Sequence, residues 1–456
     1  MQRENSSGEP AQYSAQQHGL SSQAPQGANG AAVLPEAQRP AQAALQNGDL
    51  HSQRWRIALY SDDTMGLGHR RRNLLIAQTL AHSLVQLVTL IITGVGEAGT
   101  FVRPPGVDWL ALPALRKDLD GQYDSRSLHV SLQELITLRA RVIRTALEAF
   151  EPDVLIVDNV PRGAVGELDP TLAYLRARGH TRCVLGMREV LDDPIAVHRE
   201  WSQAANEDAI RKYYDRVWVY GDPAVYDPVR EYHFSPDVAA KVRYTGYLDQ
   251  RTRLTFIETE GSDPLAALSL PPGQLVLCCV GGGEDGDRLA EAFAAAQLPP
   301  QTNGVLLMGP FMPREVQQRL RQRAATQPRL RVLEFVREPA LLLQQADRVI
   351  AMGGYNTVCE ILSFEKHALI VPRVRPRREQ LIRAERLRDL GLLDVLPPDQ
   401  LSPSALSEWL ARDLAALPRV RDRIDLNGLT RLPHLLGEVL AGPRYPAQSQ
   451  LREGSL

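Results

Sequence analysis

The chain has 456 residues, more than one hydrophobic core usually supports, so two domains are expected. Its net charge of −2 gives no general attraction to nucleic acid or to an anionic membrane, and no apolar stretch is uninterrupted for long enough to span a membrane. The four cysteines lack metal-ligand spacing. We therefore expect a cytoplasmic protein, for which peripheral contact with the inner face of the membrane stays open.

Residues 1–52 are rich in Gln, Ala, Ser, Gly and Pro and poor in large apolar side chains. They bury too little surface to offset the entropy of ordering, so we predict an N-terminal extension that is disordered. A strand is expected over 55–60, followed by a glycine loop that ends at His69, a helix over 70–83 and a strand over 84–93. This βαβ unit places the loop at the carboxyl end of the first strand, where open α/β sheets bind ligands.

The alternation of strands and helices continues to about residue 250. Polar residues recur just past the predicted strand ends, on the side of the sheet where ligands bind. We assign 53–250 to a Rossmann-like domain and 251–272, which has no clear periodicity, to a linker region. The further elements expected in this domain are a helix over 132–150 and strands over 153–157, 183–186, 216–220 and 242–247.

The same pattern restarts after the linker, which indicates a second Rossmann-like domain over 273–440, followed by a flexible tail over 441–456. The fold class predicted is α/β, with two doubly wound domains facing a central cleft. The elements expected in the second domain are strands over 275–280, 305–308, 330–335, 346–351 and 368–372, a helix to about 390, and a C-terminal helical segment to about 440.

The glycine pair Gly353-Gly354 separates a buried strand from a helix that we expect to begin at Asn356 or Thr357. Two adjacent glycines let the backbone come close to a ligand, and the helix directs unpaired N–H groups and its positive dipole end at the turn. Phosphate is the usual occupant of such a site. The structural alternative is a capping box, because Thr357 and Glu360 are three residues apart.

Three groups of residues follow strands of the second predicted sheet: the glycines Gly281–Gly283, the turn from Gly353 to Glu360, and the pair Glu379-Gln380. Together they resemble the C-terminal domain of GT-B nucleotide-sugar glycosyltransferases, particularly the peptidoglycan N-acetylglucosaminyltransferase group. The set of motifs is most similar to a bacterial group of predicted glycosyltransferases with the same Gly-Leu-Gly-His loop. The resemblance covers roughly residues 54–440 and implies a nucleotide-diphosphate sugar as substrate, most often a UDP sugar, and no cofactor.

This resemblance implies that Asn356 and Thr357 hold the diphosphate and that Glu360 accepts hydrogen bonds from the ribose hydroxyls. The backbone N–H groups of the three glycines would face the diphosphate or the sugar. The donor-binding residues implied are Gly281, Gly282, Gly283, Phe335, Val336, Gly353, Gly354, Asn356, Thr357, Glu360, Glu379 and Gln380.

The family also implies sites for the base and the sugar. The segment Glu334-Phe335-Val336 matches the place where the family's backbone reads the base edge, and Glu379 and Gln380 match a pair that contacts sugar hydroxyls. Tyr355 and Asn356 depart from the residues of the peptidoglycan enzyme. The family often has Gln or Asp where Glu379 stands, which leaves the sugar's identity open.

Gly66, Gly68 and His69 resemble the family's first glycine loop, where a histidine faces the acceptor. An inverting transfer needs a general base for the acceptor hydroxyl, and histidine suits that role because its ordinary pKa is close to working pH. Asp158 is the second candidate, as the base or as the residue that orients His69, and Asp63 is the third. The structural alternative for His69 is a helix N-terminal residue bonded to a neighbouring carbonyl.

Two arginine-rich segments and the pattern of acidic residues complete the prediction. Arg70-Arg71-Arg72 is expected to be a solvated first helical turn, with room for one arginine to face an anionic acceptor. The arginines from Arg373 to Arg378 are expected in a mostly solvated loop, where one could neutralise the leaving group. No Asp-x-Asp follows a strand beside the expected diphosphate, so we expect metal-independent activity, with a helix dipole and N–H groups stabilising the leaving group.

The leading hypothesis is thus an inverting, metal-independent glycosyltransferase that binds a nucleotide-sugar donor and an unknown acceptor, without nucleic acid. A UDP-sugar 2-epimerase of the non-hydrolysing kind has the same two-domain fold, but its usual acidic and histidine set is not evident here. The third hypothesis is a nucleotide-sugar-binding subunit that has lost catalysis. Intact His69, Asp158 and Glu360 argue against it.

Overall fold

The computed structural model describes residues 54–61, 68–84, 86–94, 104–117, 123–257, 264–413 and 419–442. The predicted disordered extension over 1–52 lies outside the described residues. So do the candidate residues Gly66 and Asp63 of the first glycine loop, and the chain from 443 onward.

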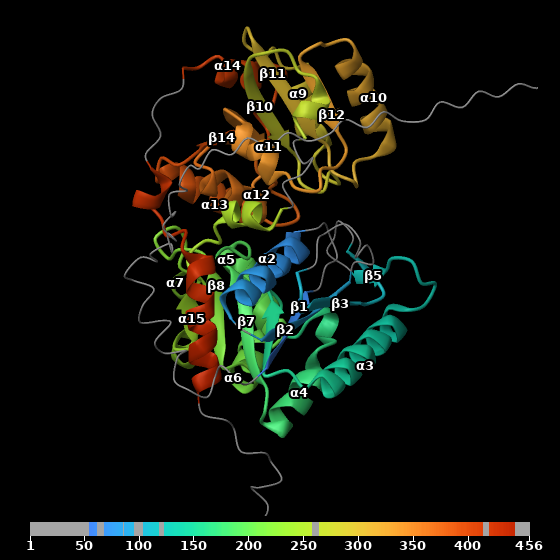
Figure 1. Ribbon diagram of the computed structural model, residues 1–456, viewed down its shortest axis with the longest axis vertical. Helices are drawn as coiled ribbons and strands as arrows, with labels where there is room; N and C mark the ends of the chain where they lie inside the picture. The colour runs from blue at the N-terminus through green and yellow to red at the C-terminus, as the bar shows by residue number, and fades with distance from the viewer. Residues whose placement is uncertain are drawn as a thin grey trace, which may run out of the picture. The chain divides into compact units, whose positions relative to one another are not determined.

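The first sheet has seven parallel strands in the order β3-β2-β1-β6-β7-β8-β9 (Figure 1). The order reverses between β1 and β6, and the crevice outside the carboxyl ends at such a switch point is where doubly wound sheets bind ligands. The strands are β1 (Trp55–Ser61), β2 (Leu87–Thr93), β3 (Val107–Ala111), β6 (Val154–Asp158), β7 (Arg182–Arg188), β8 (Arg216–Tyr220) and β9 (Val242–Tyr244), and a separate hairpin joins β4 (Leu115–Lys117) to β5 (Tyr123–Ser125).

Helices cover both faces of this sheet, because alternate residues of β1 enter two different hydrophobic clusters. Ile57 and Leu59 pack in the cluster that includes α2, whereas Ala58 and Tyr60 pack in the cluster that includes α3. Strands buried on both faces read as continuous apolar runs. The helices of this region are α2 (Gly68–Ser83), α3 (Leu132–Phe150), α4 (Asp169–Arg178), α5 (Pro194–Gln203), α6 (Asn206–Tyr213), α7 (Pro228–Glu231) and α8 (Pro236–Ala239).

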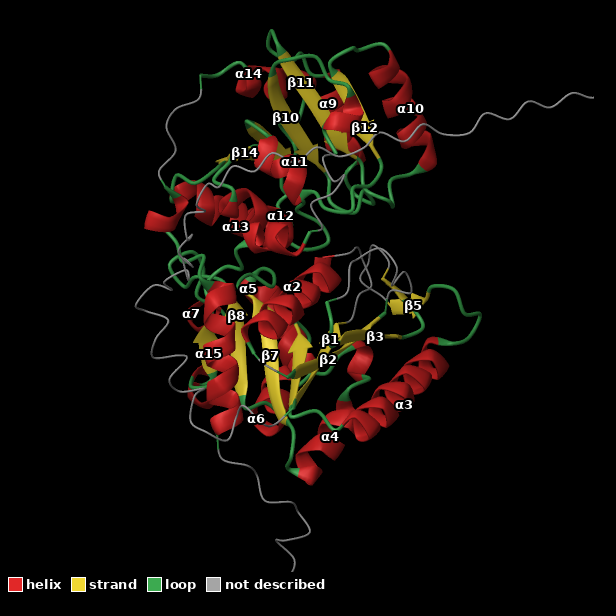
Figure 2. Ribbon diagram, in the orientation of Figure 1, coloured by secondary structure: helices red, strands yellow, loops and turns green. Residues whose placement is uncertain are grey.

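The second sheet has six parallel strands in the order β12-β11-β10-β13-β14-β15, and its switch point lies between β10 and β13. Figure 2 shows β10, β11 and β12 side by side in this sheet. The two predicted glycine turns follow these two strands. The strands are β10 (Gln274–Cys279), β11 (Thr302–Leu307), β12 (Leu330–Leu333), β13 (Arg348–Ala351), β14 (His367–Ile370) and β15 (Asp394–Val395), and the helices are α9 (Asp287–Ala295), α10 (Arg314–Ala325), α11 (Ala340–Gln345), α12 (Tyr355–Ser363), α13 (Glu379–Asp389) and α14 (Pro403–Leu410).

The last helix, α15 (Gly428–Ala441), packs against α2 in the first half of the chain. The Gly428 N–H donates to Tyr247 O at 3.0 Å, and the Arg431 side chain donates to Thr245 O. Sequence order alone had assigned this segment to the second domain. The first half is therefore built from two separate stretches of chain. In the sequence, the residues of the second sheet lie between these two stretches.

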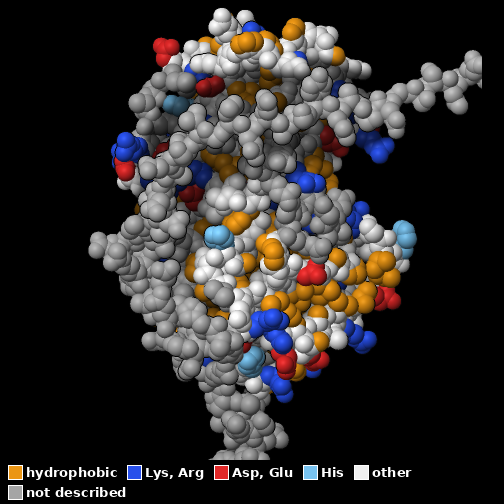
Figure 3. Space-filling model, viewed as in Figure 1, with side chains coloured by type: hydrophobic (Ala, Val, Ile, Leu, Met, Phe, Trp, Pro, Cys, Tyr) orange, Lys and Arg blue, Asp and Glu red, His pale blue; other side chains and the backbone are white. Residues whose placement is uncertain are grey.

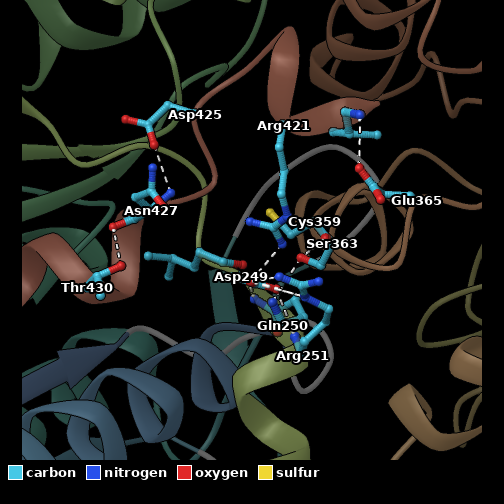
Figure 4. A network of polar contacts seen from close by, with 12 residues as sticks. Asp249, Gln250, Arg251, Cys359, Ser363, Glu365, Arg421, Asp425, Asn427 and Thr430 are labelled. Atoms are coloured by element: carbon cyan, nitrogen blue, oxygen red, sulfur yellow. Dashed lines mark hydrogen bonds and ion pairs between the residues drawn. The ribbon is translucent and has the colours of Figure 1, made fainter. Parts of the chain in front are cut away.

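The two segments that connect the halves are joined by polar contacts (Figure 4). Asp249 accepts hydrogen bonds from Arg251 at 2.9 Å and from Arg421 at 2.8 Å. Next to it, the Gln250 N–H donates to Ser363 Oγ at 2.9 Å, at the end of α12. The short 3₁₀ helices of the chain are Ala164–Gly166, Gln250–Phe256, Ala266–Leu268 and Val420–Asp422.

The observed architecture confirms the predicted fold class, two Rossmann-like domains of the α/β type. The helix α3 has the predicted bounds, because a capping box of Ser131 and Glu134 fixes its start and Glu151, in the left-handed region, ends it. Two helices begin earlier than predicted, at Gly68 and at Tyr355. Among the described residues, no helix is both long and apolar enough to cross a membrane.

Candidate active site

A pocket of about 300 Å³ lies at the carboxyl ends of both sheets. Its walls are the first turn of α2, the end of β7, the loops after β10, β11, β12 and β13, and the start of α13. The candidate residues in its lining are Gly68, His69, Gly281, Gly282, Phe335, Val336, Gly354, Asn356, Thr357, Glu360 and Gln380. The lining does not include the other described candidates, which are Asp158, Gly283, Gly353 and Glu379.

His69 forms a hydrogen-bonded group with Asp158 and Arg72. His69 Nδ1 lies 2.7 Å from Asp158 Oδ2, and Arg72 Nη2 lies 2.6 Å from each oxygen of the same carboxylate. Since a carboxylate only accepts hydrogen bonds, the Nδ1 proton points at Asp158 and Nε2 is left as the basic nitrogen. Arg72 Nη2 is also 2.9 Å from Nδ1, but with the proton on Nδ1 both groups are donors, so Arg72 donates to the Asp158 carboxylate instead. This geometry can orient a histidine base toward a hydroxyl in the pocket.

Asp158 is 1% exposed, so its charge depends on its neighbours. Burial raises the pKa of a carboxyl, but here the charges of Arg72 and His69 and their hydrogen bonds outweigh burial and lower the pKa of Asp158 to about 2. A carboxyl with this pKa is ionised at neutral pH, and its place between Arg72 and His69 suits a group that orients the histidine.

The arginines at the start of α2 are not solvated, in contrast to the prediction. Arg70 is 0% exposed and lies 4.8 Å from the centre of the Trp109 ring, and Arg72 is 3% exposed. Arg71 donates to the carbonyl oxygens of Val336 at 3.4 Å and Arg337 at 3.1 Å. The prediction was wrong because the partners of these arginines lie far away in sequence.

The helix α12 begins at Tyr355, and its N-cap residue Gly354 provides no side-chain cap. Thr357 and Glu360 therefore do not form the capping box, and the first N–H groups of the helix face the pocket lined by Asn356 and Thr357. The turn before the helix is held from α13, because the Gly353 N–H donates to Gln380 Oε1 at 3.0 Å. This arrangement suits an anion.

Glu360 lies in the pocket wall and is 5% exposed. Burial raises its pKa, and the charges of Arg71 and Arg253 oppose this shift without cancelling it. Arg253, from the segment after β9, pairs with Glu338 at 2.8 Å. Neither Arg253 nor Glu338 was a candidate in the sequence, because nothing in the local pattern marks them.

The glycines after β10 have separate roles. Gly281 has a φ of 65° and nothing within 4 Å of the position of a Cβ, and it lines the pocket with Gly282. Gly283 has a φ of 92°, and a Cβ there would lie 2.3 Å from Met308 O. Gly281 and Gly282 can thus bring the backbone close to a ligand, whereas Gly283 permits close packing of two loops.

The two residues at the start of α13, Glu379 and Gln380, also differ in whether they line the pocket. Gln380 lines the pocket, and its Oε1 also accepts from the Arg373 N–H at 3.0 Å. Glu379 is 4% exposed and accepts a hydrogen bond from Arg373 Nη2 at 2.6 Å. Arg373 pairs with Asp285 as well, at 2.9 Å, and lines the pocket, whereas Arg375 and Arg378 of the same loop are exposed, as expected of a mostly solvated loop.

An apolar surface adjoins this region. Phe311 lines the pocket and is 41% exposed, and the Arg126 guanidinium lies 5.8 Å from the centre of its ring. The loop that carries Arg126 also exposes Leu128 and Val130. Figure 3 shows that hydrophobic side chains gather over α3, which follows this loop.

Comparison with known proteins shows which families this chain is similar to. Residues 276–421 match the model of the glycosyltransferase family 28 C-terminal domain. An uncharacterized glycosyltransferase from Methanosarcina acetivorans is 22% identical over 390 residues, which cover 83% of this chain and 93% of that relative. A UDP-N-acetylglucosamine–N-acetylmuramyl-(pentapeptide) pyrophosphoryl-undecaprenol N-acetylglucosamine transferase from Cronobacter sakazakii is 31% identical over 163 residues, which cover 35% of this chain but only 45% of that relative.

Solved structures of the same fold include a UDP-glucosyltransferase from Polygonum tinctorium, with a TM-score of 0.58 at 13% identity over 86% of this chain and 100% of that chain. A UDP-GlcNAc 2-epimerase from Methanocaldococcus jannaschii has a TM-score of 0.55 at 10% identity, over 85% of this chain and 100% of that chain. At such identities the likeness shows the fold alone. Together with the family match, it makes this chain a glycosyltransferase of the GT-B class.

Proposed function

We propose that this chain transfers a sugar from a nucleotide-diphosphate sugar, first of all a UDP sugar, to an acceptor hydroxyl, with inversion and without a metal ion. The observation that carries the proposal is that His69 and the N-terminus of α12 line one pocket. One supplies a base for the acceptor, and the other supplies a site for the leaving diphosphate.

The donor lies along the second half in this proposal. The diphosphate binds the N–H groups at Asn356 and Thr357 and the backbone at Gly281 and Gly282, all of which line the pocket. Glu360 accepts hydrogen bonds from the ribose, as the resemblance implies. The pocket-lining segment at Phe335 and Val336 contacts the base.

The reaction follows from this placement. His69 Nε2 takes the proton of the acceptor hydroxyl while its oxygen attacks the anomeric carbon on the face opposite the diphosphate. The bond from that carbon to the phosphate oxygen breaks, and its electron pair stays on the diphosphate, where the dipole of α12 stabilises the charge. Asp158 stabilises the imidazolium that forms at His69, because it is ionised and lies 2.7 Å from Nδ1.

A donor screen tests this proposal first. UDP, GDP and dTDP sugars are added to the full chain in a thermal-shift assay, where a ligand at ~100 times its dissociation constant stabilises by about 2.7 kcal/mol. The donor that binds is then incubated with a panel of acceptors, and the product's anomeric configuration is read by NMR. Transfer with inversion supports the proposal. An epimer of the donor's sugar, binding without any product, or retained configuration would each contradict it.

A further inference from the structure

Arg188, the last residue of β7, is a cation in the pocket wall that forms no ion pair with any acidic side chain of the described residues. Its side chain is half-buried, and it lines the pocket together with His69, Arg72 and Tyr355. Within the described residues, its one hydrogen bond runs from Nε to Asn159 Oδ1 at 3.4 Å, and it forms no ion pair. Its guanidinium therefore keeps donors available on the pocket side.

The neighbouring arginines differ from Arg188 in this respect. Arg72 pairs with Asp158 at 2.6 Å, Arg373 with Glu379 at 2.6 Å, and Arg383 with Glu189 at 2.6 Å. Burial and the charge of Arg72 lower the pKa of Arg188 to about 10, although Glu379 acts in the opposite direction. Arg188 is thus still charged at neutral pH. A charge kept away from water without a partner is costly, and an anionic ligand would offset that cost.

The N-terminus of α12 lines the same pocket. Gly354 and Tyr355, the N-cap and first residue of the helix, are both in the lining, and no side chain caps the helix. The Tyr355 ring lies 5.3 Å from the Arg72 guanidinium and 5.5 Å from that of Arg383. An uncapped nine-residue helix and an arginine without an ion pair therefore converge from opposite halves of the chain.

We propose that Arg188 binds the diphosphate of the donor from the first half of the chain and stabilises the charge that develops on the leaving nucleoside diphosphate. This inference rests on the proposed function. When the bond between the anomeric carbon and the phosphate oxygen breaks, the electron pair remains on that oxygen, and the planar guanidinium can donate two parallel hydrogen bonds to phosphate oxygens. A carboxylate on the transferred sugar or on the acceptor is the competing partner for Arg188. The convergence with α12 favours the diphosphate.

Titration calorimetry on the full chain tests this without knowledge of the acceptor. The probes are the nucleoside diphosphate that the wild type binds best among UDP, GDP and dTDP, and the matching nucleoside. Arg188→Gln should weaken diphosphate binding about tenfold to hundredfold, the usual loss for a hydrogen bond to a charged group, and leave nucleoside binding unchanged. Arg188→Lys, which keeps the charge but not the paired geometry, should fall between wild type and Arg188→Gln.

The matched control is Arg386→Gln, which removes the same charge from an arginine outside the pocket that pairs with Glu231 at 3.1 Å. It should bind both probes as the wild type does, and thermal melting shows that each variant is folded. Diphosphate affinity within twofold of wild type in Arg188→Gln overturns the inference, and selective loss of binding to a uronic acid donor would assign Arg188 to the sugar. If the wild type itself binds no nucleoside diphosphate, the proposed function fails and this inference fails with it.

Discussion

Arg383 and Glu189 form an ion pair that joins α13 to the loop after β7, and neither side chain is exposed to solvent. Arg383 Nε lies 2.6 Å from Glu189 Oε1, and Arg383 Nη1 donates to Gly353 O at 3.2 Å. The Tyr247 hydroxyl donates to the same Glu189 oxygen at 3.0 Å. One buried pair thus connects the first half of the chain to the glycine turn before α12.

Removing one member of this pair should be strongly destabilising. Glu189→Ala leaves the Arg383 charge buried without its partner, so we expect the free energy of unfolding to fall by about 3–5 kcal/mol. Urea unfolding followed by tryptophan fluorescence measures this. The double variant Glu189→Ala with Arg383→Met should recover part of the loss, because it removes the uncompensated charge. A loss below about 1 kcal/mol in Glu189→Ala would mean that water reaches Arg383.

His69→Ala should lower turnover about 10²- to 10⁴-fold and leave donor binding unchanged, because a general base acts in the transition state. Turnover is measured at saturating donor, and binding by calorimetry. His129→Ala, on the loop before α3 and outside the pocket lining, is the control. More than about a third of wild-type turnover in His69→Ala would remove it as the base. Loss of folding and binding together would instead indicate that His69 holds its loop in place.

Asp158→Asn should show whether Asp158 orients His69. The amide keeps the shape but loses the charge that stabilises the imidazolium and that pairs with Arg72, so turnover should fall while the donor's affinity stays within about twofold. The depressed pKa of Asp158 also fixes the pH range of its effect. A carboxyl with a native pKa of about 2 stabilises the fold above its ordinary value of 3.8, and this stabilisation is lost between pH 3.8 and about 2. An acid limb of activity above pH 4 should therefore persist in Asp158→Asn.

The contribution of Glu360 to stability should depend on pH in the direction opposite to that of Asp158, and Glu360→Gln tests this. The pKa of Glu360 is raised in the native state, so the stability that it contributes is present below its ordinary value of 4.5 and is lost as pH rises through the native pKa. The variant should therefore gain stability relative to wild type as pH rises above 4.5, by at most about 1.4 kcal/mol per pH unit. Urea unfolding at several pH values from 4 to 8 tests this, and parallel curves for the two proteins would contradict it.

The same Glu360→Gln variant should bind the donor more weakly. If the carboxylate accepts hydrogen bonds from the ribose, its loss should weaken binding about tenfold to hundredfold. A nucleotide whose ribose hydroxyls are replaced by hydrogen should bind wild type and variant alike. Unchanged affinity for the intact donor would return Glu360 to a purely structural role.

Activity should survive EDTA. The N-terminus of α12 supplies positive potential where the leaving group is proposed to sit, and within the described ranges no cluster of three or more His, Cys, Asp or Glu side chains could hold a metal ion. Initial rates are compared before and after chelation. Abolition by EDTA with rescue by Mg²⁺ or Mn²⁺ would overturn the metal-independent reaction.

Local sequence patterns were sufficient for much of the fold. The strands of the first sheet are continuous apolar runs, and the capping box at Ser131 marks the start of α3 within the chain itself. The glycine turn before α12 could be placed in the same way, because glycines between a buried strand and a helix have a direct steric meaning. Neighbouring residues alone determine these features.

Long-range partners could not be predicted in this way. Arg70 and Arg72 look like a solvated helical turn, and their burial depends on Trp109 and Asp158, which come from other strands. Gly283 looks like part of a phosphate loop, but it is required for packing, because the Cβ of any other residue there would clash with Met308 O. The role proposed for Arg188 likewise depends on α12, whose start lies 167 residues further along the chain (355 minus 188).

The return of α15 to the first half also affects how the protein is made. Its cluster with α2 includes residues as far as Leu440, and the Arg421–Asp249 contact joins the outgoing and returning segments. During synthesis, the first sheet can form early with α2 packed on it, but the part of that face that α15 covers stays open until residues 428–441 have left the ribosome. The second half, in contrast, has its complete sheet by Val395. The domain whose synthesis begins first is thus the last to be completed.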